Sequence, residues 1–478
     1  MILTKTKIST ADKNSVICAL ASGAGRSALA VIRISGPGCL NLIETVFHAK
    51  GKARLAKTPR VARYGRILAG TSTIDDVLLT YFPHGNSFTG EESLEINCHG
   101  NPLIVRQILN QLYLLGIEPA APGEFSRRAV LNGKLNLHQA EAIREIIEAR
   151  GERELQAARW MQDGHFRNEL LQMRSSLFNL TADVTAELDF VEEDIEFSSN
   201  QNKINSLEAV LQYVQKLGER AEGGNLLHSG LQIAIIGAPN TGKSSLLNLL
   251  SGKEKAIVSD IPGTTRDYIE ESIQIAGVPV TFVDTAGLRH NSEDVLEKTG
   301  MERSILKSRE ARFILVLLDG KKEPKLAIEE SPLGSEFLKK LQLENKEHLK
   351  VLINKSDALH ADWPVDNGAL PGLLQNLQVE YISVKTQANL PVLLQWLTES
   401  IDKSLGSESL LLASWQSDLL RQIEKELETA LVLLEANEAP EITATVLRNA
   451  LDLMGQITGE ISNEDLLGRI FSRFCVGK

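Results

Sequence analysis

The sequence predicts a multidomain protein that combines α+β and α/β architecture, because three patterns follow one another along its 478 residues. Residues 1–135 alternate short apolar runs with Gly and Pro, which is typical of an α+β domain. From residue 135 the apolar residues recur at helical spacing without proline. Residues 231–402 then alternate strands, loops and helices, and the chain becomes helical again afterwards. The economical interpretation is one discontinuous helical domain split by an inserted α/β domain, with these predicted boundaries: 1–134, 135–229, 230–402 and 403–478.

The first domain is expected to contain several strands and one long helix. The apolar run at 16–21 and the segments 28–38, 75–83 and 91–100 have the composition of strands bounded by turn residues. Residues 102–116 have helical periodicity and end at a glycine. At the other end of the chain, a last helix is expected after Ser462, with Asp465 in its first turn. Its aromatic continuation, Phe471 and Phe474, predicts a docked tail and not a disordered one.

Charge and cysteine content restrict the class of protein. The net charge is −11, yet residues 1–135 hold 16 Lys and Arg against nine Asp and Glu, and seven of these cations lie between Lys50 and Arg66. Such a segment is either a solvated loop or a surface for a polyanion such as nucleic acid. Four scattered cysteines form no metal or disulfide pattern, so we expect a reducing, cytoplasmic compartment. No apolar run approaches the ~18 residues of a membrane span.

The most specific motif lies at residues 231–250. Leu231–Ile236 is a continuous apolar strand, Gly237 to Ser244 fits the phosphate loop G-x-x-x-x-G-K-[ST], and a helical run follows. Backbone amides and the helix N-terminus attract phosphates. Lys243 is expected to reach the β- and γ-phosphates, and the hydroxyl of Ser244 to bind Mg²⁺. Since strand and helix flank the motif, a chance match is a poor alternative.

Further nucleotide motifs follow in the expected order. Thr265 of "PGTTRD" is placed to coordinate Mg²⁺, and "DTAG" (284–287) ends a strand with Asp284 directed at the same ion through water. Asn354, Lys355 and Asp357 of "NKSD" fit guanine recognition, because a carboxylate accepts from guanine N1–H and the 2-amino group, which adenine lacks. Ser383 of "YISVK" fits the last loop around the base. GTP is therefore the expected nucleotide.

The sequence lacks the residue that positions the attacking water in Ras-like GTPases. Leu288 follows "DTAG", where Ras-like proteins have a water-positioning glutamine. Asn240 could hold a monovalent cation through its side-chain carbonyl, and Glu297 could orient water indirectly. An asparagine in a loop or a glutamate in a switch segment is more often structural or solvated.

The motifs together resemble the MnmE (TrmE) family of bacterial tRNA-modification GTPases, in the TrmE-Era-EngA-like GTPase superfamily. The resemblance covers essentially the whole chain and rests on "AVIRISGPG", "NSFTGEESLEINCHG", "APGEFSRRAVLNGKLNLHQAEAI", "GAPNTGKSSLLN", "SDIPGTTRD", "DTAGLR", "GEISNEDLLGRIF" and the terminal "FCVGK". It implies an N-terminal tetrahydrofolate-binding and dimerisation domain, a helical domain of two segments, and an inserted Ras-like P-loop GTPase domain.

The resemblance also implies the ligands and their residues. For 5-formyltetrahydrofolate or a related folate, the family's contacts fall on Arg33, Glu95, Lys134 and Lys478. For K⁺ they fall on Asn240, Ser259, Ile261 and Thr264, for Mg²⁺ on Ser244 and Thr265, and the switch glutamate falls on Glu297. The expected GTP contacts are Asn240, Thr241, Gly242, Lys243, Ser244, Ser245, Ser259, Asp260, Ile261, Pro262, Gly263, Thr264, Thr265, Asp284, Thr285, Ala286, Gly287, Asn354, Lys355, Asp357 and Ser383.

The implied activity is K⁺-stimulated GTP hydrolysis within tRNA wobble-uridine modification. The family acts as a homodimer that forms a heterotetramer with the FAD protein MnmG, and together they add an aminomethyl or carboxymethylaminomethyl group to C5. Cys475 is then either a nucleophile that attacks uridine C6 or a structural residue beside a folate-binding Lys478. A prenylation site is excluded, since glycine and lysine end the chain. The alternative function is an RNA- or ribosome-associated GTPase switch without modification chemistry.

Overall fold

The structure is a computed structural model that describes these residues: 15–50, 54–189, 198–253, 272–284, 311–331, 348–364, 374–375, 377–406, 408–437, 440–459 and 464–477. The chain forms two compact units. Unit 1 comprises residues 1–144, 161–198 and 436–478, and unit 2 comprises residues 145–160 and 199–435. Within the described ranges, no helix is long and apolar enough to cross a membrane.

Unit 1 contains a seven-stranded sheet with the order β3-β4-β5-β6-β2-β1-β7, in which only the β1–β7 pair is parallel. Its strands are β1 (Ile17–Leu20), β2 (Leu29–Ser35), β3 (Phe47–Ala49), β4 (Arg63–Ala69), β5 (Ser72–Phe82), β6 (Ser93–His99) and β7 (Glu118–Pro119). The strands predicted at 16–21, 28–38, 75–83 and 91–100 are confirmed. The predicted loop of the basic run is only partly a loop, because Arg63 and Arg66 lie on β4.

One face of this sheet carries the hydrophobic core, which the helices α1 (Cys39–Ile43) and α2 (Pro102–Leu114) complete. The start of α2 is fixed locally: the side chain of Asn101 accepts a hydrogen bond from the Leu103 amide, and Pro102 occupies the first turn. Burial of one apolar stripe then holds α2 on the sheet. The other face of the sheet presents the alternate side chains, among them Arg33 and Glu95.

The helices of unit 1 join segments that are far apart in the sequence. Its α6 (His165–Asp189) packs along α14 (Pro440–Thr458), and α3 (Glu124–Leu131) contacts α15 (Glu464–Phe471). Phe471 and Phe474 are buried, with ring centroids 5.1 Å apart, which confirms the docked tail. The proposed cap Ser462 lies outside the described residues. Helix α4 (Leu137–Glu148) runs from unit 1 into unit 2, and α5 (Glu152–Gln162) runs back.

Unit 2 contains a six-stranded sheet with the order β13-β12-β11-β8-β10-β9, parallel except for the β9–β10 hairpin. Its strands are β8 (Leu231–Gly237), β9 (Ser272–Ile275), β10 (Val278–Asp284), β11 (Phe313–Asp319), β12 (Leu349–Asn354) and β13 (Gln378–Tyr381). Its helices are α7 (Asn200–Ser229), α8 (Lys243–Lys253), α10 (Pro324–Glu329), α12 (Leu390–Leu405) and α13 (Ser414–Glu435). Both β11 and β12 are buried along their whole length, as parallel strands covered on two faces should be.

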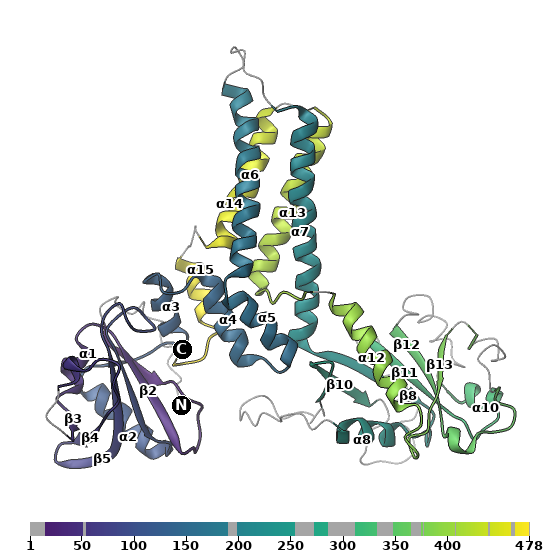
Figure 1. The fold of residues 1–478 in the computed structure, drawn as a ribbon, viewed down its shortest axis with the longest axis horizontal. Coiled ribbons are helices and arrows are strands. Elements are labelled where there is room, and N and C mark those ends of the chain that lie inside the picture. The colour runs from purple at the N-terminus through teal and green to yellow at the C-terminus, as the bar shows by residue number, and fades with distance from the viewer. Residues whose placement is uncertain are drawn as a thin grey trace, which may run out of the picture. The chain divides into compact units, whose positions relative to one another are not determined.

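Helix α7 of unit 2 packs against α13 and α12. Each long pair, α6 with α14 and α7 with α13, therefore joins a helix that precedes the α/β part to one that follows it (Figure 1). Helix α7 ends at Ser229, and α12 continues to Leu405. The four domain boundaries stay predictions.

Candidate functional site

The nucleotide motifs meet at the carboxyl edge of the six-stranded sheet. The phosphate loop connects β8 to α8, which confirms the predicted strand–loop–helix arrangement. Gly242 has φ +101°, and a Cβ atom there would lie 2.3 Å from the side-chain nitrogen of Asn354. Only glycine fits this position, so the loop backbone stays close to the residues that follow β12.

Lys243 lies in the first turn of α8 and is buried. Its ammonium group donates to the carbonyl oxygens of Gly237 (2.9 Å) and Ala238 (2.8 Å), which holds the cation across the loop. Ser244 and Ser245 follow on α8 with exposed side chains. The loop thus combines a fixed cation, a helix N-terminus and accessible hydroxyls, a combination that attracts phosphate groups.

The guanine-recognition residues are connected to the phosphate loop by hydrogen bonds. Asn354, only 2% exposed, donates to the carbonyl oxygen of Thr241 (2.7 Å) and accepts from the Val384 amide (3.1 Å). Lys355, in the left-handed region at φ +66°, donates to the carbonyl oxygen of Asn240 (2.8 Å). The two motifs, 110 residues apart in the sequence at their closest, therefore form one polar site.

Asp357 and Ser383, which the sequence assigned separately to guanine recognition, contact each other beside this site. The hydroxyl of Ser383 donates to Oδ1 of Asp357 over 2.6 Å and accepts from the Thr386 amide. The hydrogen bond from Ser383 lowers the pKa of the Asp357 carboxyl, because it stabilises the ionised form. An ionised carboxylate is the form that accepts from two donors of guanine.

Asp319 is a site residue that the sequence argument missed. It ends β11, and its carboxylate lies 2.6 Å from the ammonium group of Lys355 and accepts from the Lys321 amide. This ion pair holds the Lys355 side chain next to the phosphate loop. The sequence did contain a signal for Asp319, because an aspartate ends the apolar run "FILVLLD". The structure places this run on the strand next to the one that ends in Asn354.

Several predicted nucleotide contacts lie outside the described residues. Asp284 ends β10, where it pairs in register with Ile235 of β8, so its backbone lies at the same edge of the sheet. The remaining contacts were predicted at residues 259–265, 285–287 and 297, and Lys478 of the folate set is likewise outside the described ranges.

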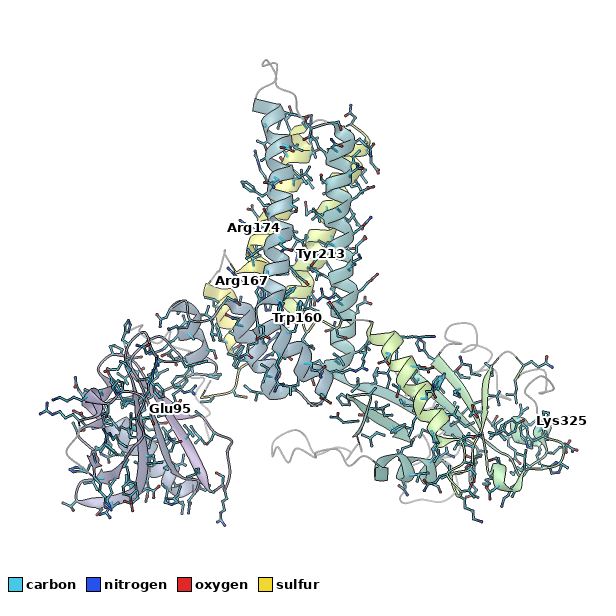
Figure 2. The ribbon with its side chains drawn as sticks, viewed as in Figure 1. Glu95, Trp160, Arg167, Arg174, Tyr213 and Lys325 are labelled. Carbon is cyan, nitrogen blue, oxygen red and sulfur yellow. The ribbon has the colours of Figure 1, made fainter. Side chains whose placement is uncertain are left out.

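Two of the predicted folate residues, Arg33 and Glu95, form an ion pair on the face of the N-terminal sheet opposite its main core. Figure 2 labels Glu95 among the side chains of this domain. Arg33 donates to Oε1 of Glu95 through both Nε (3.1 Å) and an η nitrogen (2.9 Å). Its guanidinium group also lies 5.1 Å from the ring centre of Phe88 and 5.8 Å from that of Phe125. The ion pair is partly exposed, and its arginine lies beside two aromatic rings.

Lys134 reaches the loop that carries Phe88. Its ammonium group donates to the carbonyl oxygen of Gly85 over 2.6 Å. Arg33 and Lys134, two of the four predicted folate residues, therefore both contact one loop, residues 83–92.

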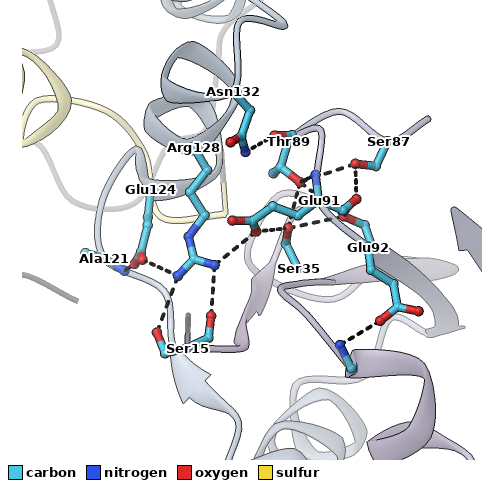
Figure 3. Close-up of polar contacts among 12 residues, drawn as sticks. Ser15, Ser35, Ser87, Thr89, Glu91, Glu92, Ala121, Glu124, Arg128 and Asn132 are labelled. Atoms are coloured by element: carbon cyan, nitrogen blue, oxygen red, sulfur yellow. Dashed lines mark hydrogen bonds and ion pairs between the residues drawn. The ribbon is translucent and has the colours of Figure 1, made fainter. Parts of the chain in front are cut away.

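A buried charge network that sequence reasoning missed supports this loop (Figure 3). Arg128 of α3 forms ion pairs with Glu91 (3.0 Å) and Glu124 (2.9 Å), and it also donates to the carbonyl oxygen of Ser15. Glu91 accepts in turn from the hydroxyl of Ser35 on β2. Removal of Arg128 would leave two poorly solvated carboxylates together, so the network fixes the loop geometry.

The C-terminal tail packs on the N-terminal part of unit 1. Val476 forms an antiparallel bridge with Pro122, and the Gly123 amide donates to the carbonyl oxygen of Cys475 (3.3 Å). Cys475 is exposed, whereas Cys18, Cys39 and Cys98 are buried and all four thiols are free. Burial raises the pKa of Cys18 to about 12 and that of Cys98 to about 11, so these two are inert thiols at neutral pH.

The phosphate loop on a parallel sheet and the adjoining Asn-Lys-x-Asp residues define the class of the protein: it is a P-loop protein of the guanine-nucleotide-binding kind. Comparison with known sequences narrows this class. Residues 137–475 match the MnmE helical domain, and residues 16–134 match the GTP-binding protein TrmE N-terminus.

Curated relatives match along almost the whole chain. The tRNA modification GTPase MnmE of Christiangramia forsetii is 36% identical over 477 residues, which cover 97% of this chain and 99% of the relative. Its counterpart in Aquifex aeolicus is 37% identical with the same coverage, and that in Akkermansia muciniphila is 37% identical, covering 98% and 100%. The chain belongs to the MnmE family of tRNA modification GTPases.

Proposed function

We propose that this chain is a K⁺-stimulated GTPase that acts with the FAD protein MnmG on the wobble uridine of certain tRNAs. The pair would add an aminomethyl or carboxymethylaminomethyl group at C5 with a tetrahydrofolate as one-carbon donor. The single observation that carries the proposal is the coexistence, in one chain of this family, of a guanine-nucleotide site with the Arg33–Glu95 pair and a tail docked on the same unit. A pure GTPase switch has no use for the last two features.

The nucleotide part of the proposal assigns roles to the chain's own residues. Lys243 and the loop amides would bind the phosphates, Ser244 and Thr265 would hold Mg²⁺, and Asp357 would select guanine. Asn240 would hold K⁺ with Ser259, Ile261 and Thr264. The backbone carbonyl of Asn240 already accepts from Lys355, whereas its side chain is exposed. The side-chain oxygen is therefore accessible to K⁺, which supports this assignment. Bound K⁺ would supply positive charge to the phosphates, the part an arginine plays in related enzymes.

The one-carbon part of the proposal rests on the face of the N-terminal sheet opposite its main core. Glu95 would accept from the N–H groups of a pterin, while Arg33, Lys134 and Lys478 would balance the negative charge of a folate. The ion pair holds Glu95 next to the Arg33 guanidinium, which itself lies over the ring of Phe88. Cys475 is exposed in a tail that contacts Pro122 and Gly123, and it is the candidate nucleophile. In the nucleotide part, Glu297 is the candidate switch glutamate.

The proposed assembly is a cytoplasmic homodimer, paired through the N-terminal domains and joined to MnmG as a heterotetramer. The basic run of that domain supports contact with tRNA. Not every cation there is available, since Arg66 pairs with Asp76 at 2.9 Å and Lys50 lies over the ring of Tyr64.

The deciding experiment is nucleoside mass spectrometry of tRNA from a strain that lacks this gene. Complementation with the intact chain should restore the modified wobble uridine, and complementation with Cys475→Ser tests the nucleophile separately. An unchanged wobble uridine after complementation with the intact chain would favour the RNA-associated switch.

The role of the cation is tested separately: Asn240→Ala should abolish the difference between the GTP hydrolysis rates in K⁺ and in Na⁺. Asn437→Ala, at another exposed left-handed asparagine, is the matched control.

A further inference from the structure

Three potential metal ligands meet in unit 2, away from the nucleotide site. They are Glu145 on α4, Glu154 on α5 and His228 near the end of α7. Nδ1 of His228 lies 3.1 Å from Oε1 of Glu154 and 3.4 Å from Oε2 of Glu145. The side chains of the two glutamates are only 1% and 8% exposed, whereas that of His228 is 53% exposed.

The distances match those of a metal coordination sphere. The three ligand atoms all lie within 4.8 Å of one another. A tetrahedral ion with metal–ligand bonds of about 2.0–2.1 Å separates its ligand atoms by roughly 3.4 Å. We propose that Glu145, Glu154 and Nδ1 of His228 bind one divalent transition-metal ion, for which Zn²⁺ has the best-fitting ligand preference.

The electrostatics of the cluster favour a dication. Two adjacent buried carboxylates repel each other. A divalent ion compensates both and is often the largest local charge in such a site. The Arg150 amide donates to Oε2 of Glu154 (2.7 Å), which leaves Oε1 of that carboxylate directed at His228. This is the outer-shell support that orients metal ligands in proteins.

Access to the site is available from one side. His228 lines a cavity of about 790 Å³, together with Arg220 and Asn225 of α7. An ion could enter through this cavity and keep a water molecule as its fourth ligand.

The position suggests a structural role at the start of the nucleotide-binding part. His228 precedes Gly230, after which β8 leads to the phosphate loop. The turn between α4 and α5, together with the start of α5, contacts the β9–β10 hairpin, because the Arg153 amide donates to the carbonyl oxygen of Gly277 and Gln274 donates to the carbonyl oxygen of Arg150. The ion would therefore connect this turn, and the hairpin it holds, to the point where α7 passes into β8.

The test uses the full-length protein, stripped with a chelator and kept in excess Mg²⁺ without nucleotide. Zn²⁺ is titrated against a chromophoric competitor. We expect one site per chain, and both His228→Asn and Glu154→Gln should weaken it at least about tenfold, since loss of even an outer-shell partner costs 10–100-fold. His360→Asn is the matched control, because His360 is a half-exposed histidine facing the single carboxylate of Asp362 at 3.5 Å.

X-ray absorption of the Zn²⁺-loaded wild type keeps the proposal testable if a variant fails to fold. One imidazole nitrogen and oxygen ligands are expected. Sulfur ligation, which would indicate Cys475, overturns the proposal, and so does a wild type without a saturable site. Equal Zn²⁺ affinity in wild type and in folded His228→Asn likewise rejects it.

Discussion

Asn354 connects the phosphate loop to the loop that contains Ser383. Its side-chain amide donates to the carbonyl oxygen of Thr241 over 2.7 Å, and its side-chain oxygen accepts from the Val384 amide. The residue that introduces the guanine-recognition motif is thus buried between the phosphate loop and the loop that contains Ser383. Because an unpaired buried polar group costs about 1–3 kcal/mol, the three segments are expected to keep their mutual geometry as one unit.

Gly242→Ala should disrupt this unit. The left-handed backbone of Gly242 disfavours alanine, and the added Cβ would lie 2.3 Å from the Asn354 side chain. Strain of roughly 1–2 kcal/mol predicts a loss of GTP affinity of about 5- to 30-fold, measured by fluorescent-nucleotide titration. Gly252→Ala on α8 is the control, since its Cβ meets nothing within 4 Å. Equal losses in the two variants would contradict the assigned contact.

Asp357→Asn should change the base that the site accepts. A carboxylate accepts from the N1–H and 2-amino groups of guanine, whereas an asparagine amide can donate to the 2-carbonyl of xanthine. We expect GTP affinity to fall at least about tenfold and XTP affinity to rise relative to wild type. Competition between the two nucleotides in one binding assay measures both effects. If GTP stays preferred to the same degree, Asp357 does not contact the base.

Ser383→Ala should make GTP binding sensitive to mild acid. In the wild type the Ser383 hydroxyl lowers the pKa of Asp357, so the carboxylate stays ionised as pH falls. Without the hydroxyl that pKa rises toward its ordinary value, and loss of GTP affinity should begin at a higher pH than in the wild type. Affinity profiles from pH 4 to 7 decide the matter, and coincident profiles would exclude a role for this hydrogen bond.

In the sequence the nucleotide motifs follow apolar strands, and the structure places these motifs at the ends of those strands. An apolar strand followed by a motif places that motif at the carboxyl edge of a parallel sheet, where Lys243 and Asn354 are found. The pairing of Asp319 with Lys355 could not be derived in the same way, because it depends on which strands are neighbours. Strand order is set by packing over long sequence separations.

The N-terminal site shows a second limit of sequence reasoning. Resemblance to a family identified Arg33 and Glu95, but only the antiparallel register of β2 and β6 places them directly opposite each other. The supporting network of Arg128 with Glu91 and Glu124 had no sequence signal beyond its charges. Local propensity predicts strands and caps, whereas partners of buried charges are decided by the tertiary fold.

His138 should make unit 1 sensitive to acid. It is buried and packs edge-on against Phe166, and burial lowers its pKa to about 4. The unfolded chain binds a proton near pH 6.5 and the folded chain does not, so stability falls as pH drops from about 6.5 toward 4. The full loss is about 3 kcal/mol. Tm measured against pH should fall less steeply in His138→Gln than in wild type, while His84→Gln, at an exposed histidine, should follow wild type.

Gly477→Ala should release the C-terminal tail and test whether its docking matters. Gly477 has φ +100°, and a Cβ there would lie 2.1 Å from the carbonyl oxygen of Leu20, so alanine cannot occupy this position without moving the tail. A displaced tail would also lose the bridge between Val476 and Pro122, and Cys475, which precedes Val476, would be displaced with the tail. We expect wobble-uridine modification to fall at least about tenfold, since a misplaced reactive group costs about 100-fold per 1 Å.

GTP hydrolysis should be unaffected in that variant, because the phosphate loop belongs to unit 2. Gly468→Ala, on α15 with nothing within 4 Å of the added Cβ, is the matched control and should restore modification fully. Nucleoside mass spectrometry in the complemented deletion strain measures the first effect, and phosphate release measures the second. Full modification by Gly477→Ala would mean that the docked position of Cys475 is not required, which would leave the tail a structural role only.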